Sequence, residues 1–163
     1  MPYFRNSLPD IPVFCCNGWA ATYCSVFLTE MPNKTIKEIK RRLKKMIFHE
    51  QFDLIVAIGR GGIIPARLIS LRLKLPFNVL HINYRNSENK IIRSAPVLLG
   101  GVPDIKNKTV LLVDDVSRSG ETIKTAKKLL KGARAIKTFV INGKADYQLY
   151  DEPCFNFPWA YNQ

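Results

Sequence analysis

The sequence predicts an α/β fold in which a mostly parallel, twisted sheet is flanked by helices. The first observation is two apolar runs without polar alternation, 54–58 and 110–113, which are typical of strands buried on both faces. The second is that amphipathic segments with helical spacing alternate with such runs, which favours a parallel sheet. The third is the length of 163 residues, which fits a single domain over 1–163 with a core of its own.

The first element that we expect is a basic amphipathic helix over residues 35–50. Its apolar residues repeat at helical spacing, and Lys37, Lys40, Arg41, Lys44 and Lys45 lie on the other side. Such a helix can bind membranes or nucleic acid, but a solvated basic face on a surface helix is commoner, and we favour it. The apolar set is Ile36, Ile39, Leu43, Met46 and Ile47.

The remaining elements follow in order along the chain. A glycine-rich turn separates the first strand from its helix, in which Pro65 is tolerated because it lies in the first turn. A polar loop over 84–108 is long enough to be functional. The expected strands are 54–58, 77–82, 110–113 and 135–141, and the expected helices after the first are 63–73 and 122–131.

Residues 11–29 carry no charge, which invites comparison with a membrane segment. Asn17-Gly18 lies between two apolar runs, and this dipeptide suits a type I′ turn, so we expect a packed hairpin. The four cysteines include no CxxC pair, so neither a metal site nor a disulfide framework is expected. A reducing cytoplasm is the simplest compartment.

The charge of the chain points to an anionic partner. Twenty-five basic residues exceed thirteen acidic ones, giving a net charge of +12. The excess lies in the middle of the chain, with +5 over 34–51 and +6 over 60–93. Nucleic acid, acidic lipid and a phosphorylated small molecule all fit this balance.

The most informative segment begins with four apolar residues, 110–113, followed by Asp114 and Asp115. Ligands bind at the carboxyl ends of strands in such sheets. The small, hydroxyl-rich loop that follows can wrap its amides around a phosphate, and the helix after it adds a positive dipole. The acids suit ribose hydroxyls or a Mg²⁺ ion. Asp and Ser as ordinary helix N-caps would explain one of these residues but not two adjacent acids.

Residues 110–122 resemble the phosphoribosyl pyrophosphate (PRPP) motif of type I phosphoribosyltransferases. Residues 53–65 resemble the strand and pyrophosphate loop of the 6-oxopurine members, especially the xanthine-guanine and hypoxanthine types. The resemblance covers about residues 35–163. It implies the type I phosphoribosyltransferase fold, with an α/β core over 34–141 and a small hood that bears on base recognition, formed by 1–33 and 142–163.

The resemblance implies transfer of 5-phosphoribose from PRPP to a nitrogenous base, a 6-oxopurine in purine salvage, with release of pyrophosphate and with Mg²⁺ as cofactor. Asp114, Asp115 and Arg60 would be catalytic, with both aspartates on the ribose hydroxyls and the metal. The family commonly has a cis peptide at the pyrophosphate loop. The residues implied for the 5′-phosphate are Ser117, Arg118, Ser119, Gly120, Glu121 and Thr122. Those for pyrophosphate are Arg60, Gly61, Gly62 and Arg85, the last within a flexible lid. Those for the base are Lys144, Phe155 and Trp159.

Further partners are also implied. We expect a cytoplasmic homo-oligomer, a dimer or tetramer, without membrane attachment. The sequence has no helix-turn-helix and no aromatic RNA-binding signature, so nucleic acid is not expected as a partner.

Two positions depart from the family pattern. Arg118 stands where 6-oxopurine members carry an aspartate as general base, and an arginine stays protonated. Cys154 stands where a purine-stacking aromatic is usual. These departures support an alternative, a non-catalytic regulator with the same fold that binds PRPP or a nucleotide, with nucleic acid as a further candidate partner.

Overall fold

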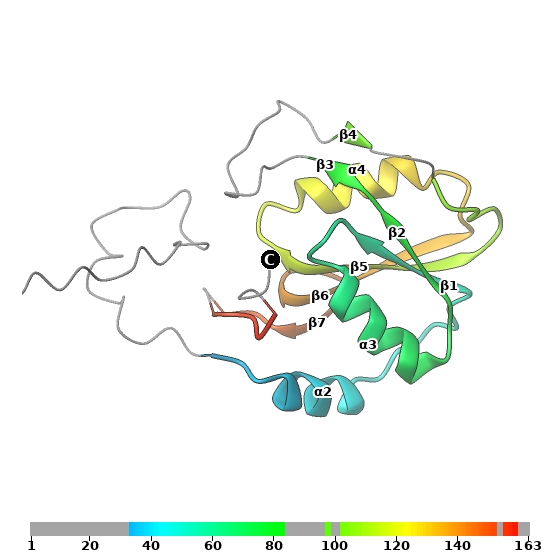
Figure 1. Ribbon diagram of the computed structural model, residues 1–163. Helices are drawn as coiled ribbons and strands as arrows, with labels where there is room; N and C mark the ends of the chain where they lie inside the picture. Colours follow the sequence, from blue (N-terminus) through cyan, green and yellow to red (C-terminus); the bar gives the residue numbers. More distant parts are fainter. Residues whose placement is uncertain (1–32, 84–96, 99–101, 153–154, 160–163) are drawn as a thin grey trace, which may run out of the picture.

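The computed structural model describes residues 33–83, 97–98, 102–152 and 155–159. Within them a five-stranded sheet has the order β2-β1-β5-β6-β7, and every neighbouring pair is parallel (Figure 1). This confirms the predicted α/β class. The strands of this sheet are β1 (Leu54–Ile58), β2 (Phe77–Leu80), β5 (Thr109–Ser117), β6 (Ala135–Gly143) and β7 (Tyr147–Tyr150).

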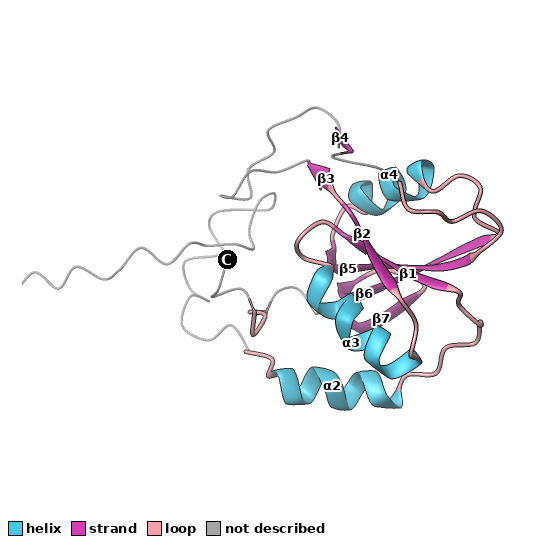
Figure 2. Ribbon diagram, turned by 45° about the vertical axis from the view of Figure 1, so that its right-hand side comes forward, coloured by secondary structure: helices cyan, strands magenta, loops and turns pink. Residues whose placement is uncertain are grey.

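Helices cover both faces of the sheet. Helices α2 (Ile36–Lys45) and α3 (Ile63–Leu73) lie on one face, and α4 (Glu121–Leu129) lies on the other (Figures 1 and 2). The core is therefore two clusters separated by the sheet, one that includes Ile39 and Ile69 and one that includes Ile123. Every residue of β1 is buried, as the uninterrupted apolar run predicts.

The predicted helix over 35–50 is too long. Helix α2 ends at Lys45, and Met46 has an extended backbone. The guanidinium of Arg72 in α3 donates to the carbonyl oxygens of Leu43 and Met46, so these carbonyls are satisfied without a further helical turn. Ile47, which we expected on the apolar face, is 71% exposed.

Two strand predictions also need correction. The expected strand over 77–82 is divided, because β2 stops at Leu80, whose carbonyl accepts the Gly59 amide. Ile82–Asn83 (β3) then pairs antiparallel with Val97–Leu98 (β4), inside the segment expected to be loop. Strand β7 was not expected at all.

The connection between β6 and β7 explains why β7 escapes the sequence pattern. Parallel strands are ordinarily joined by a crossover of a dozen or more residues, but here only 144–146 intervene. The Asp146 carboxylate accepts hydrogen bonds from the Thr138 amide (2.8 Å) and hydroxyl (2.6 Å). This side chain fixes the short return of the chain beside β6.

Several predictions lie outside the described residues. They are the hairpin around Asn17-Gly18, the environments of all four cysteines, and the lid residue Arg85. In the part of the chain that the structure describes, no helix is both long enough and apolar enough to cross a bilayer.

Candidate functional site

The acid pair lies at the carboxyl end of β5, at the centre of the sheet. Asp114 is 8% exposed and Asp115 is half-buried. Each carboxylate accepts an amide hydrogen from the next residue, Asp115 N–H to Asp114 Oδ1 at 2.9 Å and Val116 N–H to Asp115 Oδ1 at 2.7 Å. The backbone of β5 therefore orients both acids.

The acid pair is electrostatically unfavourable in the free protein. Burial raises the pKa of Asp114 well above its ordinary value, and the Asp115 charge raises it further. Burial also raises the pKa of Asp115, although the amide contacts oppose the shift. Two adjacent carboxylates that resist ionisation are suited to a partner that supplies donors or positive charge.

Asp114→Asn is expected to stabilise the protein in the absence of ligand. An acid whose pKa is raised by folding binds its proton more tightly in the folded state, so its contribution falls as pH rises from the unfolded pKa of about 3.9. Asparagine removes this loss and keeps the Oδ1 acceptor. We expect Tm to increase by about 2–4 °C near neutral pH, or about 1 kcal/mol for this size.

The check is a series of thermal melts from about pH 4 to about pH 8 on both proteins. The difference in Tm between the variant and the wild-type protein is expected to be small at about pH 4 and to increase toward neutral pH. A difference that narrows instead as pH rises would contradict the assigned pKa direction.

The turn after β1 approaches the acid pair closely. A Cβ added at Gly61 would lie 2.6 Å from Asp115 Oδ1, and one at Gly62 would lie 2.4 Å from the carbonyl oxygen of Val113. Gly61 thus contacts a side chain of the site, whereas Gly62 packs against the backbone of β5. Arg60 is exposed beside them. The described peptide bonds are all trans, so the cis peptide expected at this turn is not present.

Gly61→Ala is expected to impair the site more than the fold. The added methyl group must displace the Asp115 carboxylate, because a contact of 2.6 Å is shorter than van der Waals distance. We expect Tm without ligand to change by less than about 4 °C, or about 1 kcal/mol, and affinity for PRPP to fall at least about tenfold. Titration calorimetry measures the affinity of the wild-type protein and of Gly61→Ala for PRPP. Unchanged affinity would show that Asp115 is not positioned by this contact.

The loop from Ser117 to Gly120 leads into α4 with its first turn open. Gly120 is the N-cap, with a φ of +73°, and as a glycine it makes no side-chain capping hydrogen bond. Nothing lies within 4 Å of a Cβ built at Gly120. The Ser119 hydroxyl accepts the Glu121 amide at 3.4 Å, and Thr122 is half-buried at the first turn. Amides and hydroxyls at an uncapped helix N-terminus suit an anion.

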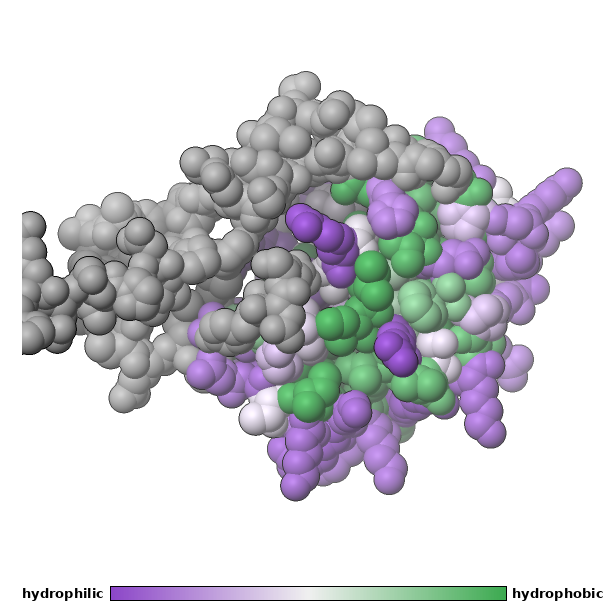
Figure 3. Space-filling view, viewed as in Figure 1, coloured by the Kyte–Doolittle hydropathy of each residue, from purple (hydrophilic) through white to green (hydrophobic). Residues whose placement is uncertain are grey.

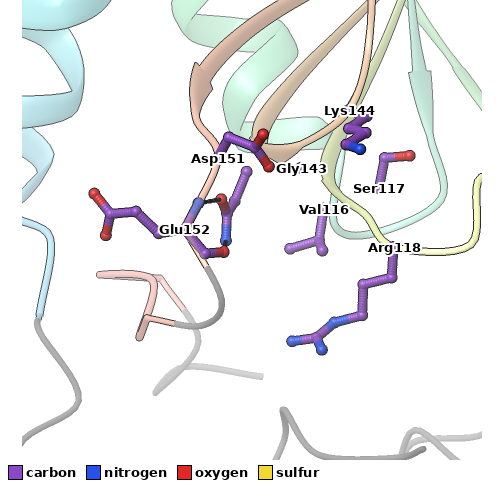
Figure 4. A pocket seen from close by; sticks show the side chains of 8 residues that line it. Val116, Ser117, Arg118, Gly143, Lys144, Asp151 and Glu152 are labelled. Atoms are coloured by element: carbon purple, nitrogen blue, oxygen red, sulfur yellow. Dashed lines mark hydrogen bonds between the residues drawn. The ribbon is translucent and has the colours of Figure 1, made fainter.

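A pocket of about 270 Å³ lies beside this loop, between the ends of β5 and β6 and the segment after β7 (Figure 4). Arg118 and Lys144 line it on one side and Asp151 on the other. The Asn142 side chain holds the segment after β7, since it donates to the Glu152 carbonyl and accepts the Glu152 amide, both at 3.0 Å. The Glu152 carboxylate pairs with Lys34 at 3.0 Å.

The structure brings together most of the residues singled out from the sequence. Ser117, Arg118 and Lys144 line one pocket, and Gly61 meets Asp115. Phe155 and Trp159, 2% and 7% exposed, lie in the core cluster beneath α2 and α3. Phe155 contacts the Tyr150 ring at 5.0 Å, and Trp159 stacks on Phe157 at 5.1 Å. A role for these two rings in base binding stays a prediction.

Three polar residues of the pocket were not predicted from the sequence. Asn142 follows a buried apolar run directly, as the acid pair does, and this position was a usable signal. Asp151 and Glu152 follow β7, which was not expected, so nothing in the sequence placed them at the sheet edge.

The donor set fits Mg²⁺ bound jointly by protein and substrate. The described residues contain no group of three His, Cys, Asp or Glu side chains that could hold a metal ion. Mg²⁺ commonly uses one or two carboxylates together with substrate phosphates and water. Asp114 and Asp115, whose pKa values burial raises, supply such carboxylates.

Comparison with known proteins agrees with this geometry. A family model described as a phosphoribosyl transferase domain matches residues 30–158. The transcriptional regulator GfcR of Methanococcus maripaludis strain C5 is 30% identical over 114 residues, which is 69% of this chain and 55% of that protein. The chain thus spans about half the length of the curated relatives it matches.

Two solved structures share the fold of this chain. The purine phosphoribosyltransferase of Pyrococcus horikoshii superposes with a TM-score of 0.61 at 27% identity, covering 78% of this chain and 91% of that one. A hypothetical protein of Neisseria gonorrhoeae, solved with bound ppGpp, gives a TM-score of 0.61 at 26% identity, covering 78% and 87%.

Proposed function

Because the chain belongs to the phosphoribosyl transferase domain family, we propose that it transfers 5-phosphoribose from PRPP to a 6-oxopurine base and releases pyrophosphate. The observation that supports the proposal best is the close approach of the Gly61 turn to Asp115, at the end of the strand from which the chain continues into the N-terminus of α4. PRPP carries three chemical groups that these parts suit, which are a ribose diol, a pyrophosphate and a 5′-phosphate.

In this proposal each part of PRPP meets a different backbone segment. The 5′-phosphate binds the amides of 118–122, with hydroxyl donors from Ser117, Ser119 and Thr122. The ribose hydroxyls donate to Asp114 and Asp115, which are already oriented by their amide contacts. Arg60 and the Gly61 amide receive the pyrophosphate, as does Arg85.

The chemistry required of the protein is positioning and electrostatic stabilisation. As the bond between C1 and the pyrophosphate oxygen lengthens, positive charge develops on the ribose and negative charge on the leaving group. In this proposal the acid pair stabilises the positive charge on the ribose, and Arg60 stabilises the negative charge on the pyrophosphate. Asp114 and Asp115 would hold Mg²⁺ together with substrate oxygens, and the metal would supply further charge neutralisation on the pyrophosphate.

The pocket beside the loop is the proposed base site. Its cationic side can donate from Lys144 to the exocyclic oxygen of a 6-oxopurine, and the Asp151 carboxylate opposite can accept from ring or amino N–H groups. A pocket of about 270 Å³ has a volume of the order expected for a small flat ligand. A purine nucleotide would fill both the pocket and the phosphate loop, which agrees with the ppGpp bound in the Neisseria relative.

The test is direct. The protein is incubated with PRPP, Mg²⁺ and hypoxanthine, guanine, xanthine, adenine or orotate, and the nucleotide product is separated and quantified. Inosine, guanosine or xanthosine monophosphate is the expected product. If no base yields a nucleotide while PRPP still stabilises the protein, the transferase assignment is wrong.

Arg118→Asp is expected to increase turnover with 6-oxopurines. The permanently protonated guanidinium cannot accept the proton that a purine nitrogen loses on glycosylation, whereas a carboxylate at this position can. General-base catalysis contributes about 10²–10⁴-fold where it operates, and we expect kcat to rise at least about tenfold. Arg118→Gln is the control, because it removes the charge without adding a base. A decrease in kcat for Arg118→Asp would give Arg118 a role of its own.

A second candidate function is a regulator that binds PRPP or a nucleotide without turnover. Arg118 and the 30% identity to a transcriptional regulator favour it. The product assay separates the two functions, since a regulator binds PRPP but forms no nucleotide with any base.

We also propose that the protein acts in the cytoplasm as a homo-oligomer, a dimer or tetramer. Light scattering coupled to size-exclusion chromatography tests the assembly, with a monomer mass of 18.6 kDa as the result that contradicts it.

A further inference from the structure

Helix α2 carries basic side chains that the fold does not use. Lys37, Lys40, Arg41, Lys44 and Lys45 are exposed, and they form no ion pair or side-chain hydrogen bond with any described residue. We call these five residues the basic face. Helix α2 lies at the lower edge of the molecule (Figure 1), and Figure 3 shows extended hydrophilic side chains along that edge.

The two charged residues of α2 outside the basic face are committed to packing. The Glu38 carboxylate accepts the Tyr150 hydroxyl at 3.0 Å and pairs with Arg42 at 3.7 Å. The Arg42 guanidinium also donates to the Leu149 carbonyl at 3.1 Å and lies 4.1 Å from the Tyr150 ring centroid. The acid of α2 is therefore neutralised on the inner side, and the outer side carries positive charge alone.

The basic face has a regular spacing. Lys37, Arg41 and Lys44 occupy positions i, i+4 and i+7, which form one stripe about 10 Å long on the helix surface. Lys40 and Lys45 flank the stripe on either side. Repeated cations along one line match a ligand with repeated anions better than a single small ion.

The same helix argues against insertion into a membrane. Peripheral helices bind lipid by burying apolar side chains below the headgroups. Two of the three apolar residues of α2, Ile39 at 0% and Leu43 at 4% exposed, are already buried against the protein core. Ile36, at 39% exposed, is the only apolar side chain that the helix leaves exposed, and a single such side chain offers little area to bury in lipid. A protein partner is disfavoured too, because lysine is depleted in protein interfaces.

A hollow adjoins the basic face. It has a volume of about 400 Å³ and lies between the end of α2 and the edge strand β7, with Arg41 and Lys45 on its rim and Met46 and Leu149 among its apolar lining residues. The hollow gives room for a flexible backbone to follow the helix into a recess flanked by cations.

We propose that the basic face of α2 binds the phosphate backbone of nucleic acid without regard to sequence. Lysine and arginine on phosphates supply the affinity of sequence-independent binding. The lack of a base-reading motif in the sequence agrees with this mode, since contacts to phosphates position a protein but carry no sequence information. The surface lies on the helix that packs on α3 and β7, apart from the acid pair.

The experiment measures binding by fluorescence anisotropy over a range of salt concentrations. The two labelled probes are a mixed-sequence single-stranded RNA of about 20 nucleotides and a mixed-sequence DNA duplex of about 20 base pairs. The variant is Lys37→Gln/Arg41→Gln/Lys44→Gln. The matched control is Lys106→Gln/Lys128→Gln/Lys131→Gln, which removes the same charge from exposed residues at α4 and before β5. Circular dichroism and Tm confirm that both variants fold.

Loss of three phosphate contacts is expected to weaken RNA binding about 100-fold near 0.1 M salt and to reduce the slope of log K against log salt by about 2, with a somewhat larger change on the duplex. The control is expected to stay within about threefold of wild type. Equal losses of nucleic-acid affinity in both variants would overturn the assignment of binding to α2. A wild-type protein that binds neither probe at low salt would overturn it as well. Equally tight, α2-dependent binding to phosphatidylserine vesicles would overturn nucleic acid as the partner. Stabilisation by PRPP should persist in both variants, so this outcome is separate from the proposed reaction.

Discussion

Asp115→Asn is expected to abolish most of the stabilisation that PRPP and Mg²⁺ confer on the protein. The ribose hydroxyls would lose a charged acceptor, and hydrogen bonds to charged groups contribute about 1.5–3 kcal/mol each. That loss corresponds to an affinity about 10- to 100-fold weaker. A ligand at 100 times its Kd stabilises by about 2.7 kcal/mol, so a 100-fold weaker ligand at the same concentration stabilises by only about 0.4 kcal/mol.

The measurement is a thermal shift at fixed PRPP and Mg²⁺ concentrations, followed by titration calorimetry. Asp104→Asn is the matched control, because Asp104 is an exposed acid paired with Lys108 at 3.0 Å, remote from β5's carboxyl end. The control should keep the wild-type shift. An Asp115→Asn protein that keeps the full shift would remove the acid pair from the ligand site.

Gly143→Ala is expected to cause the largest loss of stability among these substitutions. Gly143 has a φ of +103°, and a Cβ there would lie 2.1 Å from the carbonyl oxygen of Ser117. The two residues are paired across β5 and β6, so the clash is between backbones and no rotamer can relieve it. We expect a loss of about 3 kcal/mol, or roughly 6–12 °C in Tm.

Gly132→Ala separates the two causes of that loss. Gly132 also has a positive φ, +109°, but nothing lies within 4 Å of an added Cβ. It should therefore show only the cost of the left-handed backbone, about 1 kcal/mol. If both alanines cost the same by chemical denaturation, the close approach of Gly143 to Ser117 would not be what requires glycine. A retained PRPP shift in folded Gly143→Ala would likewise show that this strand pair does not position Ser117.

The parts of the fold that sequence predicts well are those with an unambiguous local pattern. The uninterrupted apolar runs of β1 and β5 identify buried parallel strands, and the acids that follow the second run lie at the carboxyl end of β5, where we propose that PRPP binds. These features are predictable because burial on both faces leaves no room for polar alternation.

The parts of the fold that the sequence does not predict depend on side-chain contacts that no local pattern of residues indicates. The end of α2 is set by Arg72, some thirty residues away along the chain, and the return into β7 is set by Asp146 on Thr138. Asn142 and Glu152, which hydrogen-bond to each other, likewise become neighbours only because the chain returns beside β6. No local periodicity encodes such contacts.

The close approach of the turn after β1 to the acid pair at the end of β5 cannot be predicted from sequence spacing alone. The sequence places Gly61 after β1 and Asp115 at the end of β5, but only the parallel pairing of these strands brings the glycine against the carboxylate. The electrostatic consequence, a raised pKa for both acids through burial, depends on that packing.

The central claim is that the loop between β5 and α4 and the adjacent acid pair bind PRPP as one unit. Calorimetric titration of the wild-type protein with PRPP, ribose 5-phosphate and pyrophosphate, each with Mg²⁺, tests it most directly. We expect PRPP to bind at least about 100-fold more tightly than either fragment, and each fragment to bind measurably and in competition with PRPP. Absence of binding by both PRPP and ribose 5-phosphate would contradict the account.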